Sequence, residues 1–212
     1  MLMRKDGEKT RQALLEAACA AFAEQGYDAA TNAEICRRAD ANIAAINYHY
    51  GSKAGLYRAV WEYGLAEAER LYPLDGGLAP DALPEARLRA HVRALVCRKH
   101  DESRLGFWQR LHFLEMTHPS GLLGESMAEW RAMARRYTLS VLRELLGPSV
   151  PREQVELCEM SLISQCLFAG GGPLKRRGLA LWQVNEENME AVVDHIVRFS
   201  LAGIAAAREA AE

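Results

Sequence analysis

The sequence predicts an all-α protein with a small N-terminal head and a larger helical body. Apolar residues recur with the helical period in almost every segment of the 212 residues, and no stretch of useful length alternates as a β-strand does. Proline and glycine concentrate in residues 72–85, which marks the best boundary in the chain. We therefore expect an N-terminal domain at 7–68 and a C-terminal domain at 84–212.

The first helix is predicted from an alanine-rich stretch at residues 10–27. Leu14, Ala18 and Phe22 fall at i, i+4 and i+8, so they form one apolar stripe along the helix. Gly26 is expected to end this helix, because glycine adopts the left-handed conformation that follows many helices without a steric penalty.

Two short helices joined by a tight turn are predicted next. Thr31 and Glu34 have the spacing of a capping box, which starts a helix of about two turns. Asp40 tolerates the left-handed conformation of a turn, and Asn42 is a good N-cap for a helix over about 43–49. Such a pair is typical of a helix-turn-helix unit, although periodicity alone also allows a simple corner of a helical bundle.

The remaining helices follow from periodicity and from the residues that interrupt it. Ser52 is the expected cap of a helix from Lys53 to about Leu71. Beyond the proline- and glycine-rich boundary, further helices are predicted at about 85–100, 103–117, 122–146, 152–169 and 186–209.

Composition is that of a soluble globular protein, with 50% apolar and 25% charged residues and a formal net charge of −2. The five cysteines form no CxxC pair, and we find neither a secretory signal nor an apolar run that could span a membrane. These observations predict a reducing, cytoplasmic location without a membrane partner. Because no global positive charge indicates nucleic acid, any such partner must be held by a local surface.

The segment GYDAATNAEICRRADANIAAINYHYGSKAGLYRAV resembles the N-terminal domain of TetR-type (TetR/AcrR) transcriptional regulators. It shares the Gly-aromatic pair, the Thr-capped helix, the short recognition helix that ends in Tyr-aromatic, and the Ser-Lys pair that opens the next helix. The resemblance covers roughly residues 10–65. It implies a three-helix helix-turn-helix DNA-binding domain, followed by a larger helical domain for ligand binding and dimerisation.

This resemblance implies that the helix from Ile43 enters the major groove of double-stranded DNA. Small alanines let the helix backbone approach the bases, an asparagine amide suits an adenine or a phosphate, and tyrosine, histidine and lysine suit phosphate oxygens. The predicted DNA-binding residues are Thr31, Asn32, Ala33, Ala44, Ala45, Asn47, Tyr48, His49 and Lys53. Tyr50 is expected in the core, and His49 has no second metal ligand nearby in the sequence.

The head departs from the family pattern at two positions and has no excess of positive charge. Asp40 stands where a glycine is usual, and Ala33 stands where a polar or basic residue often reaches DNA. Within residues 1–53, the bases Arg4, Lys5, Lys9, Arg11, Arg37, Arg38 and Lys53 are matched in number by the acids Asp6, Glu8, Glu16, Glu24, Asp28, Glu34 and Asp40. A neutral head is expected to bind non-specific DNA weakly.

A homodimer is expected, because one helix-turn-helix head reads only a few base pairs. The resemblance implies that the last two helices form the interface. The residues predicted for it are Val155, Leu162, Ile163, Cys166, Met189, Val193, Ile196 and Gly203. The same apolar residues are equally those that a monomer core needs.

A candidate sensor lies between the head and these helices, where aromatic and methionine side chains mix with a few polar groups. The predicted ligand pocket contains Trp108, His112, Glu115, Met116, Trp130, Met133 and Tyr137, all of which would also suit a core. The stretches LEMTHPSG and ISQCLFAGGG resemble the body of the CecR (CerR-type) subgroup. His112, Glu115 and His118 could suggest a metal, but His118 leaves the shared helix face, so we predict no metal and no cofactor.

Enzymatic function is not predicted, because the sequence contains no P-loop, G-x-G-x-x-G, HExxH or G-x-S-x-G motif. We expect a ligand-responsive repressor that binds a palindromic operator as a homodimer and releases it when a small apolar or aromatic effector binds. The alternative is a constitutive helical DNA-binding or scaffold protein without a ligand.

Overall fold

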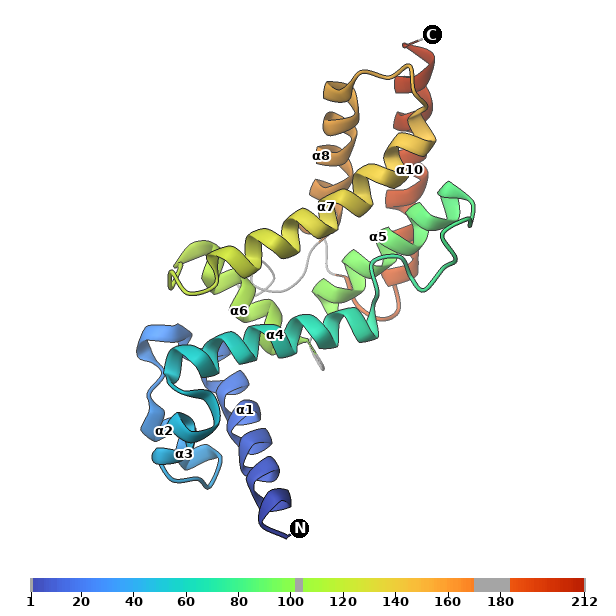
Figure 1. Ribbon diagram of the computed structural model, residues 1–212. Helices are drawn as coiled ribbons and strands as arrows, with labels where there is room; N and C mark the ends of the chain where they lie inside the picture. Colours follow the sequence, from blue (N-terminus) through green and yellow to red (C-terminus); the bar gives the residue numbers. More distant parts are fainter. Residues whose placement is uncertain (1, 102–104, 170–183, 212) are drawn as a thin grey trace. The chain divides into compact units, whose positions relative to one another are not determined.

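The fold is all-α, as predicted. The computed structural model describes residues 2–101, 105–169 and 184–211, and all regular secondary structure within these ranges is helical (Figure 1). The helices are α1 (Leu2–Ala29), α2 (Asn32–Arg38), α3 (Ala44–Tyr50), α4 (Lys53–Leu71), α5 (Pro84–His100), α6 (Gly106–Thr117), α7 (Gly124–Leu146), α8 (Arg152–Phe168) and α10 (Met189–Glu209). The first two residues of the predicted helix 103–117 and the glycines 170–172 lie outside the described ranges.

The chain divides into two compact units that differ from the predicted division at residues 72–85. The first unit consists of Met1–Glu67 and Glu102–Met127, and the second consists of Ala68–Asp101 and Ala128–Glu212. Helix α6 therefore packs with the N-terminal helices, above all with α1. Periodicity predicts that a helix exists but says nothing about which neighbour it packs against, so this arrangement could not be predicted from the sequence pattern.

The core of the first unit is built on the predicted stripe of α1. Leu14, Ala18 and Phe22 are fully buried, and the Phe22 ring packs edge-on against Tyr57 of α4 with centroids 4.8 Å apart. Gly26 interrupts α1 with φ 78° and ψ 177°, after which the chain resumes a helical path to Ala29. The first helical segment thus ends at Gly26, as predicted, and a second, short segment completes α1 to Ala29.

Helix α6 approaches α4 closely at a glycine. A Cβ atom on Gly64 would lie 2.2 Å from the Cδ1 atom of Trp108, so no larger residue fits there without displacing the indole. The Trp108 ring also packs against Trp61, one turn earlier on α4, with ring centroids 5.6 Å apart. Glycine in a helix interior costs about 1 kcal/mol relative to alanine, and the contact with Trp108 offsets this cost.

The core of the second unit is formed by apolar side chains from α5, α7, α8 and α10. They include Leu88, Val92, Val96, Val141, Leu142, Leu146, Val155, Leu162, Cys166, Val193, Ile196 and Ile204. Ion pairs join α5 to its neighbours at the surface: Arg93 contacts Glu190 of α10 at 2.7 Å, and Arg87 contacts Glu144 of α7 at 2.8 Å.

All five cysteines, Cys19, Cys36, Cys97, Cys158 and Cys166, are free thiols. Four of them are buried, and Cys158 is half-buried. Burial raises the pKa of the Cys19 and Cys166 thiols to about 12, so both remain protonated and pack as small apolar groups.

The polar side chain of His91, on α5, is buried in the second unit. Its Nδ1 lies 2.9 Å from the carbonyl oxygen of Leu74, and its Nε2 lies 2.9 Å from Oγ1 of Thr138 on α7. In the neutral ring, Nδ1–H donates to the carbonyl oxygen of Leu74. The Thr138 hydroxyl also lies 3.0 Å from the carbonyl oxygen of Ala134, so its single proton serves either that carbonyl or Nε2 of His91. Burial lowers the pKa of His91 from its ordinary value of 6.5 to about 4.

The stability of the second unit should therefore fall in mildly acidic solution. Below pH 6.5, His91 becomes protonated in the unfolded chain, whereas in the folded chain it stays neutral until about pH 4. Lowering the pH through this window therefore favours the unfolded state. Between pH 7.5 and 4.5, denaturant titration should show a loss of about 2–3 kcal/mol from this residue. His91→Gln should be less stable at neutral pH and should lack this part of the pH dependence; identical pH profiles would contradict the assignment.

Candidate functional site

The turn between α2 and α3 has the geometry of a helix-turn-helix unit. Oγ1 of Thr31 accepts a hydrogen bond from the backbone N–H of Glu34 at 3.2 Å, which caps α2. Asp40 adopts a left-handed conformation with φ 49°, as its place in the turn predicts. Oδ1 of Asn42 accepts from the N–H of Ala44 at 2.9 Å and so supports the first turn of α3.

Helix α3 buries one side and exposes the other. Ile46 is fully buried and, with Ile35 and Cys36 of α2, holds the two short helices together. Ala44 and Asn47 are exposed, and Tyr48 is 84% exposed. The outward face of α3 therefore presents a methyl group, an amide and a phenol to solvent, with no charged side chain among them.

The other residues of α3, Ala45, His49 and Tyr50, are partly buried. Ala45 and His49 are half-buried, and the His49 ring packs edge-on against Tyr48 with centroids 4.8 Å apart. The hydroxyl of Tyr50 donates to the carbonyl oxygen of Arg11 at 2.7 Å, so this residue ties α3 to α1. Tyr50 is half-buried and is not among the buried core residues where it was predicted to lie, although its hydroxyl makes this structural contact.

The predicted phosphate-contacting residues flank this face. Thr31 and Ala33 are exposed at the start of α2, while Asn32 is half-buried. The ammonium group of Lys53 donates to the carbonyl oxygen of Asp28 at 3.3 Å and lies 4.5 Å from the ring centroid of Tyr27. These contacts hold the lysine charge at the start of α4.

Two arginines of α2 are paired within the head. Glu34 accepts two 2.8 Å hydrogen bonds from Arg37 and one of 2.7 Å from Arg38, which also contacts Glu24 at 2.9 Å. The hydrogen bonds from Arg37 and Arg38 lower the pKa of Glu34 to about 2, so the carboxylate stays ionised near neutral pH. Arg37 and Arg38, two of the positive charges counted in residues 1–53, are thus paired with carboxylates of the head.

Four of the predicted ligand-pocket residues lie on α6, in the first unit. Trp108 is buried against Gly64, and the His112 ring stacks on Trp108 with centroids 5.8 Å apart. Glu115 is buried, and its Oε1 accepts a 2.6 Å hydrogen bond from the hydroxyl of Tyr57 on α4. Met116 is 62% exposed. Three of these four side chains therefore contribute to the packing of α6 against α4.

The Tyr57–Glu115 pair has one more partner. The backbone N–H of Ser120 lies 3.3 Å from both carboxylate oxygens of Glu115. Burial, followed by the hydrogen bond to Glu115, raises the pKa of the Tyr57 phenol, so its proton stays in place between the two oxygens. One carboxylate thus joins α4, the last turn of α6 and the segment that follows α6.

The other three predicted pocket residues, Trp130, Met133 and Tyr137, lie on α7 in the second unit. The Tyr137 ring packs against His91 with centroids 5.0 Å apart, and the Arg87 guanidinium lies 6.0 Å from its centroid. Trp130 is half-buried and Met133 is exposed. Tyr137 consequently belongs to the same polar cluster as the buried histidine.

Five of the residues predicted for a dimer interface are buried in the core of the second unit: Val155, Leu162, Cys166, Val193 and Ile196. Ile163 and Met189 are half-buried, and Gly203 is exposed. The large apolar side chains that α8 and α10 expose are instead Leu157, Met160, Leu167, Phe168 and Phe199. Because α8 is apolar on all sides, its periodicity did not reveal which face points inward.

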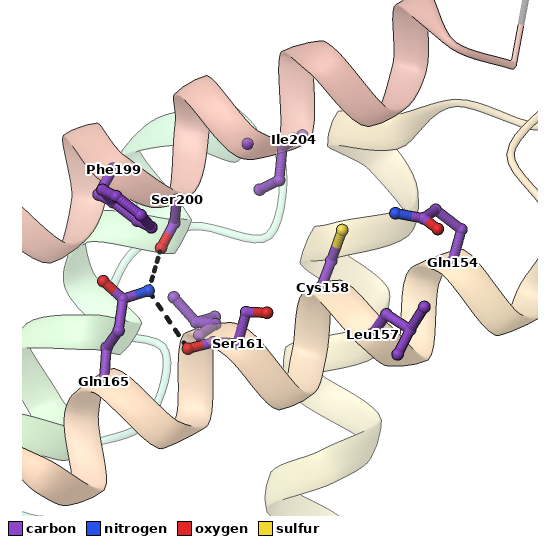
Figure 2. Close-up of a pocket in the computed structure, with 10 residues that line it drawn as sticks. Gln154, Leu157, Cys158, Ser161, Gln165, Phe199, Ser200 and Ile204 are labelled. Atoms are coloured by element: carbon purple, nitrogen blue, oxygen red, sulfur yellow. Dashed lines mark hydrogen bonds between the residues drawn. The ribbon is translucent and has the colours of Figure 1, made fainter.

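A groove of about 200 Å³ lies between α8 and α10 (Figure 2). It is lined by Gln154, Leu157, Cys158, Ser161, Leu162, Gln165, Phe199, Ser200, Gly203 and Ile204. Nε2 of Gln165 donates to the carbonyl oxygen of Ser161 at 3.2 Å and to Oγ of Ser200 at 3.4 Å, which joins the two helices across the floor of the groove. The groove is therefore lined by both apolar and polar side chains.

The three residues that were considered as metal ligands each contact a different side chain. His112 stacks on Trp108, Glu115 accepts from Tyr57, and Nδ1 of His118 lies 3.1 Å from Oγ1 of Thr117. Within the ranges that the structure covers, no group of three or more His, Cys, Asp and Glu side chains is arranged to hold a metal ion. None of the helices described there is long and apolar enough to cross a membrane.

Two protein families match this chain in separate regions. Residues 14–60 match the family described as bacterial regulatory proteins of the tetR family. Residues 84–204 match the C-terminal domain of the HTH-type transcriptional dual regulator CecR. The first match covers the helix-turn-helix unit, and the second covers more than half of the chain.

Similar proteins of known name are also transcription regulators. The chain is 29% identical to the HTH-type transcriptional regulator SrpR of Pseudomonas putida over 138 residues, which are 65% of this chain and 62% of SrpR. It is 37% identical to CecR of Shigella flexneri over 103 residues, which are 43% of this chain and 41% of CecR. The matched segments thus span less than two thirds of either relative.

Solved structures share the fold. A TetR-like transcriptional regulator from Rhodococcus sp. RHA1 has a TM-score of 0.69 at 18% identity, with 92% of this chain and 96% of that chain covered. AibR, in complex with isovaleryl coenzyme A and operator DNA, has a TM-score of 0.58 at 19% identity, with 90% and 97% covered. At these identities the likeness establishes the fold.

The Tyr57–Glu115 contact gives a direct test of the packing of α6. Tyr57→Phe removes the hydroxyl that serves a buried carboxylate, so it should lower the free energy of unfolding by about 1–3 kcal/mol. Tyr48→Phe removes the same group from an exposed position and should leave stability unchanged. Thermal unfolding of the two variants compares them, and equal stability would show that the hydrogen bond contributes nothing.

Proposed function

Because the chain belongs to the TetR family of transcriptional regulators and carries the CecR C-terminal domain, we propose that it is a ligand-responsive repressor that binds a palindromic operator as a homodimer. The observation that carries this proposal is the helix-turn-helix unit itself. A capped α2 and a left-handed turn at Asp40 support a short α3 whose uncharged outer face is open to solvent.

The DNA contacts fall into two groups by chemistry. Ala44, Asn47 and Tyr48 share the exposed face of α3, where small or hydrogen-bonding side chains suit base edges in the major groove. Thr31 and Lys53, at the starts of α2 and α4, suit phosphate oxygens on either side. Asn32, Ala33, Ala45 and His49 border these positions and complete the proposed surface.

The second copy would cover the groove between α8 and α10. This groove exposes apolar side chains that a water-soluble monomer has no reason to retain there, and Phe199 is 64% exposed at its rim. Gly203 leaves room beside Phe199 for another helix to come close. We therefore assign the proposed dimer interface to exposed residues of α8 and α10, and not to the buried residues that periodicity predicted.

A dimer through this groove has a measurable consequence at Phe199. Phe199→Asp should give monomers at micromolar concentration in sedimentation experiments, because a partner would bury the new charge without a counter-ion. The variant should also lose affinity for an operator with two half-sites, whose centres should lie one helical turn or a multiple apart.

Leu83→Asp serves as the matched control, since Leu83 is 73% exposed and lies outside α8 and α10. This variant should remain dimeric. If Phe199→Asp also remains dimeric, the interface lies elsewhere on the chain.

We further propose a small, largely apolar or aromatic effector that acts through α6. Support comes from the buried contacts of Trp108 and Glu115, which join α6 to a helix of the DNA-binding unit. A compound that prefers a different position of α6 would therefore change the head itself. Of the predicted ligand residues, His112 and Met116 on α6 and Trp130 and Met133 on α7 are partly or largely accessible.

Thermodynamic linkage provides the test of the effector. A coupling of about 2–3 kcal/mol gives roughly 30- to 150-fold release of the operator, and operator DNA must weaken effector binding by the same factor. Compounds are screened by thermal shift, and each hit is titrated against the protein with and without operator. Equal affinity in both titrations excludes the hit as an effector, and the failure of every hit would favour a constitutive DNA-binding protein.

A further inference from the structure

Ile43 is an aliphatic side chain in an unexpected environment. It lies directly before α3 and is 55% exposed, whereas Ile46, one turn later, is fully buried. Ile43 adjoins the exposed residues Ala44 and Asn47, so it extends the surface that is proposed to face DNA by one aliphatic side chain. The buried residues of the two short helices are Ile35, Cys36 and Ile46.

The backbone holds Ile43 in a fixed place on the outer face of α3. Its φ of −53° and ψ of −34° are helical, so its side chain shares a face with Asn47, four residues later. The carbonyl oxygen of Asn42 accepts from the N–H of Ala45 at 2.8 Å, and its side chain accepts from Ala44, which closes the turn around Ile43. A β-branched side chain also has few rotamers, so little freedom is lost when it makes a contact.

The chemistry of the side chain selects one feature of the DNA. Isoleucine forms no hydrogen bonds, and the apolar group that base pairs display in the major groove is the C5-methyl group of thymine. Building on the proposed operator binding, we infer that Ile43 is a specificity-determining residue that reads a thymine methyl group in each half-site. Asn47, on the same face, is then left to read a neighbouring base by hydrogen bonding.

The expected effect follows from the size of a methyl group. Removing one buried methyl or methylene group weakens binding about threefold to fivefold. A palindromic site contains the contact twice, so loss of both methyl groups should weaken binding by roughly tenfold or more.

The experiment changes the methyl group on the DNA and its proposed partner on the protein. An operator is first selected from random DNA with the full-length protein. Each symmetric pair of thymines is then replaced by deoxyuridine, which lacks only the C5-methyl group and keeps its base pairing. Dissociation constants are measured for the wild type, Ile43→Ala and Ile43→Val, with Leu83→Ala as an exposed aliphatic control.

The inference predicts one symmetric thymine pair at which deoxyuridine weakens the wild type and the control about tenfold. Ile43→Ala should bind the two forms of this operator within twofold of each other, and Ile43→Val should lie between. All variants should keep the wild-type melting temperature, since Ile43 is exposed.

Two different failures can be told apart. If no sequence is enriched from random DNA, the proposed operator binding fails, and this inference fails with it. If an operator is obtained but deoxyuridine weakens the wild type and Ile43→Ala equally at every position, the inference alone is wrong.

Discussion

A buried carboxylate fixes the arrangement of the first unit. Glu115 is removed from water, and a charge in that position is costly unless hydrogen-bond donors surround it. Its donors come from two places, the phenol of Tyr57 on α4 and the backbone of Ser120 beyond α6. If these segments moved apart, the carboxylate would lose its hydrogen-bond donors. Helix α6 therefore stays packed against α4, the helix that follows α3.

The hydrogen bonds to Glu115 explain what the sequence pattern could predict and what it could not. Helix positions were predictable because local chemistry determines them: Thr31 and Ser52 accept backbone hydrogen bonds at the starts of α2 and α4, and Asp40 takes the turn conformation. The partners of α6 were not predictable, because the hydroxyl of Tyr57 and the carboxylate of Glu115 are 58 residues apart. Trp108 and His112, which were predicted for a ligand pocket, pack between α6 and α4.

The same limit applies to α8 and α10. Their existence and length were predictable from hydrophobicity, but a helix that is apolar all round does not indicate its inward face. Leu162 and Val193 face the core of the second unit, whereas Phe199 faces solvent. In the head, the sequence allowed the charges to be counted but not paired: Arg37 and Arg38 both donate hydrogen bonds to the carboxylate of Glu34.

The distribution of the thiols has a practical consequence for Cys158. The other four cysteines are buried, and burial raises the pKa of all five thiols, Cys158 included, so exposure alone distinguishes Cys158. Cys158 is half-buried and lines the groove between α8 and α10. An alkylating probe would therefore label this side chain first, and its rate of labelling would report whether the groove is open or covered. The wild-type chain thus has a natural thiol in this groove whose labelling needs neither an engineered cysteine nor a fluorescent tag.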